Sequence, residues 1–137
     1  MSKSIKLKSK IYWDSTSIVH SKTNLNDYLE AKEIDIEISN VVNSGTILAY
    51  RLGNIVVVEV SDLKLKEDRE EWVTNVAQNL PNPIMIKNSG WCKAVLYKNL
   101  GVIQINSSGL FISERSGIQH ASNTYNGQLI YLTNENF

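Results

Sequence analysis

Residues 46–60 read TILAYRLGNIVVVEV, and this stretch decides which fold we expect. Two runs rich in apolar and β-branched residues, 46–52 and 55–60, flank the pair Gly53 and Asn54. A glycine and an asparagine between two such runs are typical of the tight turn that closes a β-hairpin. Because residues 55–58 are all apolar, we expect the second strand to be central in its sheet and buried on both faces.

Further strands are expected on both sides of this hairpin. Upstream, Ile34, Ile36 and Ile38 alternate with acidic residues, which indicates an extended chain. Leu63 and Leu65 suggest another short strand. The later expected strands cover residues 84–87, 91–97, 102–106, 110–113 and 128–133, with a turn at residues 107–109 and a loop from Glu114 to Asn126. About ten short strands separated by turn residues indicate a mostly β protein, an antiparallel sandwich or barrel rather than a parallel α/β sheet, and of these we adopt a jelly-roll-like β-sandwich.

Residues 67–80 fit two different structures. Their apolar side chains also satisfy helical spacing after an acidic opening, so periodicity taken alone favours a helix; these residues are Trp72, Val73, Val76, Ala77 and Leu80. Pro81 and Pro83 then force the chain toward extended geometry.

The first 33 residues carry a separate pattern. Residues 5–13 alternate apolar residues with lysines, as a half-buried strand does, and turn formers at 14–17 precede a short apolar run at 18–20, so we expect a hairpin. Thr23 or Asn24 could cap a short helix after it. Such a helix is marginal alone, so either the main domain or other copies of the chain would cover its apolar face.

The composition and charge of the chain exclude several classes of protein. Fourteen basic residues balance fourteen acidic ones, so no global field holds nucleic acid or an anionic membrane. The composition is not that of a membrane protein, and the N-terminus lacks the apolar block of a secretory signal, so we expect no membrane insertion and assembly in a cytoplasm. The single Cys92 excludes an intramolecular disulfide, and with two histidines it cannot complete a Cys/His zinc site. We therefore expect no metal and no cofactor.

The candidate ligand-binding residues lie mainly in the loop from Glu114 to Asn126. Uncharged hydrogen-bonding side chains surround one aromatic ring there, a composition typical of adaptable recognition surfaces; the candidates are Tyr125, Asn123, Asn126 and His120. Trp91 is a further candidate, because an aromatic face can stack on a sugar. We read Trp72, Tyr97 and Tyr131 mainly as core residues.

The sequence gives little support for a catalytic site or a metal site. His20 and His120 have no acidic residue at ligand spacing, so we read neither as a metal ligand. The acidic residues Asp62, Glu67, Asp68, Glu70 and Glu71 are interleaved with basic ones, which indicates a solvated face rather than the paired carboxylates of a glycosidase. We read Cys92 as a small core residue and the protein as a non-enzyme, with a polysaccharide hydrolase as the less favoured alternative.

Two parts of the chain resemble phage tail proteins. The segment IKLKSKIYWDSTSIVHSKTNLNDYL, residues 5–29, resembles the N-terminal module of tail and tail-fibre proteins from phages and prophages of Gram-positive bacteria. Four later segments together resemble the C-terminal head domain of phage fibres; they are GNIVVVEV (53–60), WVTNVAQNLPNP (72–83), VIQINSSGLFI (102–112) and QLIYLT (128–133).

This resemblance implies a division of the chain and a role. It implies an N-terminal attachment and oligomerisation module at 1–33, a connector strand at 34–44 and a β-sandwich head at 45–137. It also implies a homotrimer in the virion tail that contacts a bacterial surface glycan and other tail or baseplate proteins. It favours a strand at residues 72–80, and we adopt that reading. The short link between the two ends leaves open a purely structural fibre or baseplate component.

Overall fold

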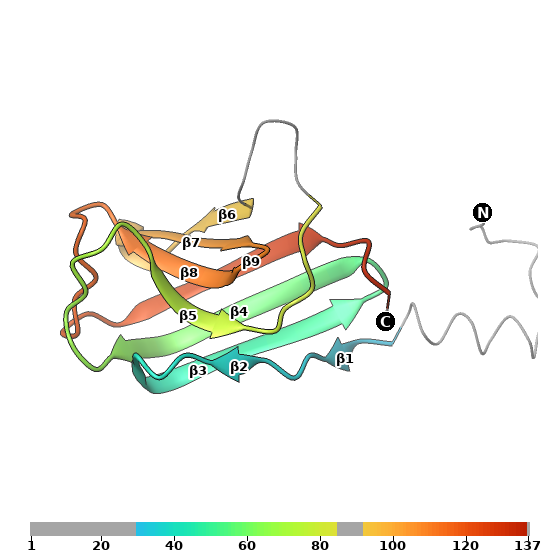
Figure 1. The fold of residues 1–137 in the computed structure, drawn as a ribbon, viewed down its shortest axis with the longest axis horizontal. Coiled ribbons are helices and arrows are strands. Elements are labelled where there is room, and N and C mark those ends of the chain that lie inside the picture. Colours follow the sequence, from blue (N-terminus) through green and yellow to red (C-terminus); the bar gives the residue numbers. More distant parts are fainter. Residues whose placement is uncertain (1–29, 85–91, 137) are drawn as a thin grey trace, which may run out of the picture.

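The computed structural model describes residues 30–84 and 92–136, which form two antiparallel sheets packed face to face (Figure 1). The first sheet has the order β1-β3-β4-β9 and contains β1 (Lys32–Glu33), β3 (Val42–Leu52), β4 (Ile55–Leu65) and β9 (Tyr125–Leu132). The second has the order β2-β5-β8-β7-β6 and contains β2 (Glu37–Ile38), β5 (Thr74–Gln78), β8 (Gly109–Glu114), β7 (Gly101–Asn106) and β6 (Cys92–Val95). A mostly β sandwich is therefore confirmed, and its description as jelly-roll-like stays a prediction.

Some expectations fall outside the described residues. These are the N-terminal hairpin and helix, His20, Trp91 and most of the expected strand at 84–87. Ile84 itself is described and lies outside any strand, although its amide donates to the carbonyl of Leu132 at 2.8 Å. Within the described part of the chain, no helix is long and apolar enough to cross a membrane.

The core lies between the two sheets, because alternate side chains of each strand point inward. Val56, Val58 and Val60 of β4 face Ile103, Ile105, Leu110 and Ile112 of the second sheet, and each is at most 2% exposed. At roughly 1.5–3 kcal/mol for each fully buried aliphatic side chain, this layer dominates the stability of the fold.

The hairpin at Gly53 and Asn54 is confirmed, since Leu52 pairs directly with Ile55. Two predictions about β4 are wrong. Leu63 and Leu65 continue β4 rather than form a new strand, because an irregularity at Asp62, with φ 51°, shifts the register and the strand goes on. The strand is central but is covered on one face only, and Ile55 is 41% exposed.

Part of the ambiguous stretch before the prolines is a strand, shorter than the 72–80 that the resemblance favours, and the helix favoured by periodicity is wrong. Residues 74–78 form β5, which pairs with β2 on one side and β8 on the other. The apolar residues that fit a helical face are divided between this strand and a loop. Val76 is fully buried in the sandwich, whereas Trp72 is 88% exposed.

The expected strand at 91–97 is shorter than predicted. β6 ends at Val95, and Tyr97 begins the short 3-10 turn η1 (Tyr97–Asn99), where Lys98 has φ 63°. The connector at 34–44 contributes β2 to the second sheet and the start of β3 to the first. The proposed domain boundaries stay a prediction.

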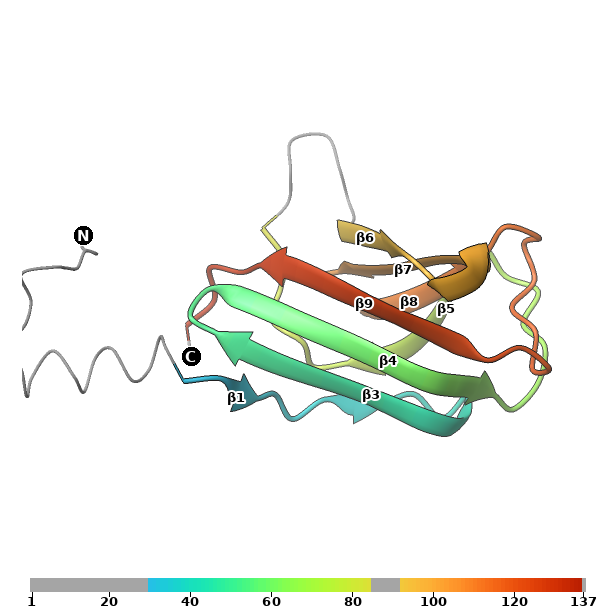
Figure 2. The ribbon, with the colours of Figure 1, turned by 180° about the vertical axis from the view of Figure 1, so that it is seen from behind.

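The sandwich has two distinct ends (Figures 1 and 2). At one end, Lys32 pairs with Arg51, and the Thr133 amide donates a hydrogen bond to the Asn54 carbonyl. Both ends of the described chain therefore lie beside the β3–β4 turn, and we call this the terminal end. The other is the loop end, formed by residues 66–73, 96–100 and 115–124. β3 and β4 each have 11 residues, so the two ends lie roughly 35 Å apart at about 3.3 Å a residue.

Candidate functional site

The two longest loops of the loop end are joined to each other by their backbones. Arg69 and Gln119 exchange amide-to-carbonyl hydrogen bonds of 2.8 and 2.9 Å. The Gln119 side chain is fully buried and extends this junction: its Nε2 donates to the Glu71 carbonyl and to Thr74 Oγ1, both at 2.9 Å. Its Oε1 accepts from the Glu114 amide at 2.9 Å. One buried amide side chain therefore holds both loops against the ends of β5 and β8.

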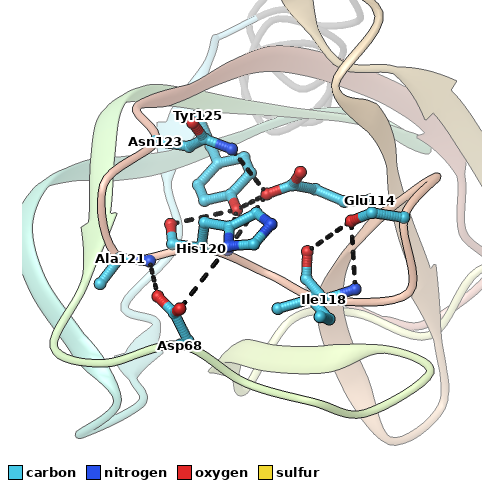
Figure 3. A network of polar contacts seen from close by, with 8 residues as sticks. Asp68, Glu114, Ile118, His120, Ala121, Asn123 and Tyr125 are labelled. Carbon is cyan, nitrogen blue, oxygen red and sulfur yellow. Dashed lines mark hydrogen bonds and ion pairs between the residues drawn. The ribbon is translucent and has the colours of Figure 1, made fainter.

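A second polar cluster surrounds the Glu114 carboxylate (Figure 3). Oε2 accepts hydrogen bonds from the Tyr125 hydroxyl, from the His120 amide at 3.1 Å and from Asn123 Nδ2 at 2.9 Å. The Tyr125 hydroxyl also accepts from the His120 amide at 2.8 Å. Burial, followed by the neighbouring Glu114 carboxylate, raises the pKa of Tyr125. The phenol therefore stays protonated and keeps donating to Glu114.

Asp68 ties the outer side of the two loops together (Figure 3). Its Oδ1 accepts from the Ala121 amide at 2.8 Å, and its Oδ2 lies 3.6 Å from Nδ1 of His120. Both side chains are partly exposed, so the pair contributes mainly to loop geometry and little to stability.

The first loop is also held from within. Nε of Arg69 donates to the Glu71 carboxylate at 2.9 Å, and Thr74 Oγ1 donates to the same carboxylate at 2.9 Å. The hydrogen bond from Arg69 lowers the pKa of Glu71 below its ordinary value of 4.5, against the opposing effect of burial. The same bond raises the pKa of Arg69. The loop that carries Trp72 is thus clamped on both sides of that residue.

The structure brings four of the five candidate residues together, but mostly as a scaffold. Tyr125 is fully buried, so the expectation that its ring offers a stacking face is wrong: as the first residue of β9 it packs into the core. Asn123 bonds to Glu114, and Asn126 Oδ1 accepts from the Asp62 amide at 2.8 Å. Ligand binding by Asn123, Asn126 and His120 stays a prediction, and Trp91 lies outside the described residues.

The exposed aromatic residues at the loop end are ones that we expected in the core. Trp72 is 88% exposed and Tyr97 is 66% exposed, with Lys98 Nζ 5.7 Å from the centroid of the Tyr97 ring. A signal for Trp72 was present in the sequence, because it directly follows the charged run 66–71 and precedes the strand. Tyr131, by contrast, is buried as expected, and its hydroxyl donates to the Pro81 carbonyl at 2.8 Å.

Comparison with known proteins adds one match. No family model matches the chain, and no curated protein matches its sequence. Among solved structures, the chain is similar to the head domain of lactococcal phage bIL170, from a study of the receptor-binding domains of lactococcal phages. The TM-score is 0.57 and the identity 13%, over 76% of this chain and 99% of that one.

The fold resembles that of a phage receptor-binding head domain. At this identity the likeness concerns the fold alone. It confirms at that level the resemblance carried by the segments from Gly53 to Thr133. The matched part of this chain covers almost the whole length of the bIL170 head domain.

The residues that we considered for metal binding and catalysis lie as follows in the described ranges, 30–84 and 92–136. No group of three or more histidine, cysteine, aspartate or glutamate side chains there lies close enough to hold a metal ion. Asp62, Glu67 and Glu70 are exposed, as a solvated face requires. Cys92 is half-buried against the core, and burial raises the pKa of its thiol, which disfavours the reactive thiolate.

Proposed function

We propose that this protein is a non-enzymatic receptor-binding protein of a phage tail and that its loop end contacts the bacterial surface. The observation that carries the proposal is the fold likeness to the bIL170 head domain, which spans nearly all of that domain. The resemblance of residues 5–29 to the N-terminal module of phage tail proteins extends this proposal. We propose a homotrimer in the virion tail that binds other tail or baseplate proteins and is assembled in the cytoplasm of a Gram-positive host.

The two ends of the sandwich support the choice of the loop end. The 29 residues before Glu30 join the described chain at the terminal end, where β1 pairs with β3. If those residues attach the protein to the virion, the loop end points away from it. Loops held by a rigid sheet scaffold are also where proteins most often carry binding residues.

The chemistry of the loop end fits a carbohydrate. Trp72 presents nearly its whole ring to solvent, and a flat apolar face with a polar edge suits the stacking of a sugar ring. Tyr97 supplies a second exposed ring. Ser116 and Ser122 add exposed hydroxyl groups, which suit the many donors and acceptors of a glycan. We therefore propose a bacterial surface glycan as the receptor.

Binding of the full-length protein to host cells and to an array of cell-wall glycans tests this function. We expect saturable binding that weakens at least about tenfold, or about 1.4 kcal/mol, in the variant Trp72→Ala. The matched control is Ile84→Ala, which removes an exposed apolar side chain at the other end of the sandwich. Equal binding by all three proteins would contradict the placement of the site, and release of reducing ends from the glycan would identify a hydrolase instead.

A purely structural fibre or baseplate component is the second candidate. It is favoured by the internal hydrogen bonds of Glu114, Asn123 and Gln119, which use polar groups at the loop end to stabilise the fold. This candidate predicts that no host cell or glycan binds the purified protein, while the protein still assembles into particles.

A further inference from the structure

The outer face of the first sheet carries a set of exposed apolar side chains. Two come from the alternate positions of β4, two from β9 and three from β3, and we call them the apolar face: Leu48, Tyr50, Leu52, Ile55, Val57, Ile130 and Leu132. Ile130 is 60% exposed and Leu132 is 55% exposed, and Val57 is half-buried by its neighbours. Nothing in the described chain covers this side of the sheet (Figure 2).

The strand register makes these side chains one continuous surface. Leu52 lies opposite Ile55, which lies opposite Leu132 on the next strand. One step along the sheet, Tyr50 lies opposite Val57, and Val57 lies opposite Ile130. Directly paired residues share a face and stand about 5 Å apart, so the rows touch one another. Charge begins at Glu33, which pairs with Tyr50, and at Glu59, which pairs with Leu48, so the two rows that contain Ile55 and Val57 form the uncharged centre of the face.

The outer face of the second sheet is different in character. There polar and apolar side chains are mixed: Val102 lies between Val95 and Ser113, and Gln104 lies between Lys93 and Phe111. Val95 is 63% exposed at the edge strand of that sheet. In the described chain, rows that are apolar on all three of β3, β4 and β9 therefore occur on the first sheet, and the corresponding rows of the second sheet include polar residues.

We propose that copies of this chain associate through the apolar face. The inference rests on the proposed function, which includes a homotrimer, and identifies the surface that holds the copies together. Six of the seven side chains are 37–60% exposed. A contiguous exposed apolar patch on the order of a few hundred Å² or more marks an interaction site on a protein surface.

The position and chemistry of the apolar face indicate that its binding partner is another copy of this chain. An uncharged centre favours contact with equally uncharged surfaces, and the other copies arranged around a rotation axis offer the same side chains. A rotation axis parallel to the strands also keeps every terminal end together, where the 29 preceding residues of each copy join the sheet beside β1. All loop ends then point in one direction, as joint contact with a cell surface requires.

Sedimentation of the full-length protein from about 1 to 100 μM tests the inference. We expect wild type to sediment as an oligomer, with a mass at least twice the 15.5 kDa of one chain. The variant Ile130→Glu places a charge in the centre of the face and raises the dissociation constant at least tenfold. Val95→Glu changes an equally exposed residue on the other sheet, and it leaves the assembly unchanged. Tyr50→Glu is a second variant, and circular dichroism melting shows that each variant is folded.

The outcomes separate this inference from the proposed function. A wild-type monomer at every concentration overturns the inference, and so does an oligomer that neither Ile130→Glu nor Tyr50→Glu weakens. A monomer that loses thermal stability with Ile130→Glu would show that the chain covers the face with its own residues, which also overturns it. Binding of a short soluble glycan, measured on the same samples, tests the function independently, since the loop end is intact in both variants.

Discussion

Gly101 holds a backbone position that a side chain cannot share with the neighbouring strand. Its φ is 153°, and a Cβ there would lie 1.8 Å from the Ser113 carbonyl oxygen. We expect Gly101→Ala to lower the free energy of unfolding by about 3 kcal/mol or more, because a backbone atom of β8 must move. Urea unfolding measures this. Gly117→Ala is the control: its φ is 83° but no atom lies within 4 Å, so a loss of only about 1 kcal/mol is expected.

Gln119 is the residue on which the loop end depends most. Replacing it by leucine leaves the Glu71 carbonyl and the Glu114 amide without their present partner in a buried place. We expect a loss of about 2–4 kcal/mol, which thermal unfolding measures. Gln78→Leu, on an exposed position of β5 in the other sheet, is the matched control and should change stability little. Equal losses of stability in both variants would show that the Gln119 junction contributes no more to the free energy of unfolding than an exposed side chain does.

At the scale of elements, the loop between β4 and β5 is stabilised by an interaction that acid removes. The pKa of Glu71 is lower in the folded protein than in the unfolded chain, chiefly because Arg69 donates to it. The stability contributed by Glu71 is therefore fully present above its ordinary pKa of 4.5 and is lost as the pH falls below that value. Both side chains are about one third exposed, so the contribution is at most about 1 kcal/mol.

Comparison of wild type with Glu71→Gln across pH 3–7 checks this contribution. We expect wild type to melt at the higher temperature near pH 6 and the difference to shrink below about pH 4.5. A difference that is constant over the whole range would mean that the charge of Glu71 is not what holds the loop.

At the scale of the whole molecule, the proposed interface at the apolar face bears on the proposed binding site at the loop end. Association through the face would place several copies of Trp72 on one side of the assembly. We expect Ile130→Glu to weaken apparent binding to host cells about 10²-fold, because simultaneous attachment of several heads is lost. Binding of a short soluble glycan, which occupies one head at a time, should not change. A loss of both would show that the face forms part of the glycan site itself.

Much of the architecture could be predicted from local patterns. The hairpin at Gly53 and Asn54, the strands at 102–106 and 110–113 and the sandwich class all follow from alternation and turn residues that lie close together in the sequence. The candidate site could not be predicted in the same way. The contacts that bury Tyr125 and orient the Trp72 loop join residues far apart, such as Gln119 and Glu71, which are 48 positions from each other.

The amino-acid sequence by itself therefore determined a mostly β chain with a central hairpin, because period and turn chemistry are local properties. Only the tertiary structure decided which apolar side chains are covered. Residues 55–58 are all apolar, yet one side of β4 lies in the core and the other, with Ile55, is open. Likewise Tyr125, which follows a polar loop, is buried, and Trp72, which we read as a core residue, is exposed. Burial depends on what packs against a residue, and that is set by sheet order rather than by neighbouring residues in the chain.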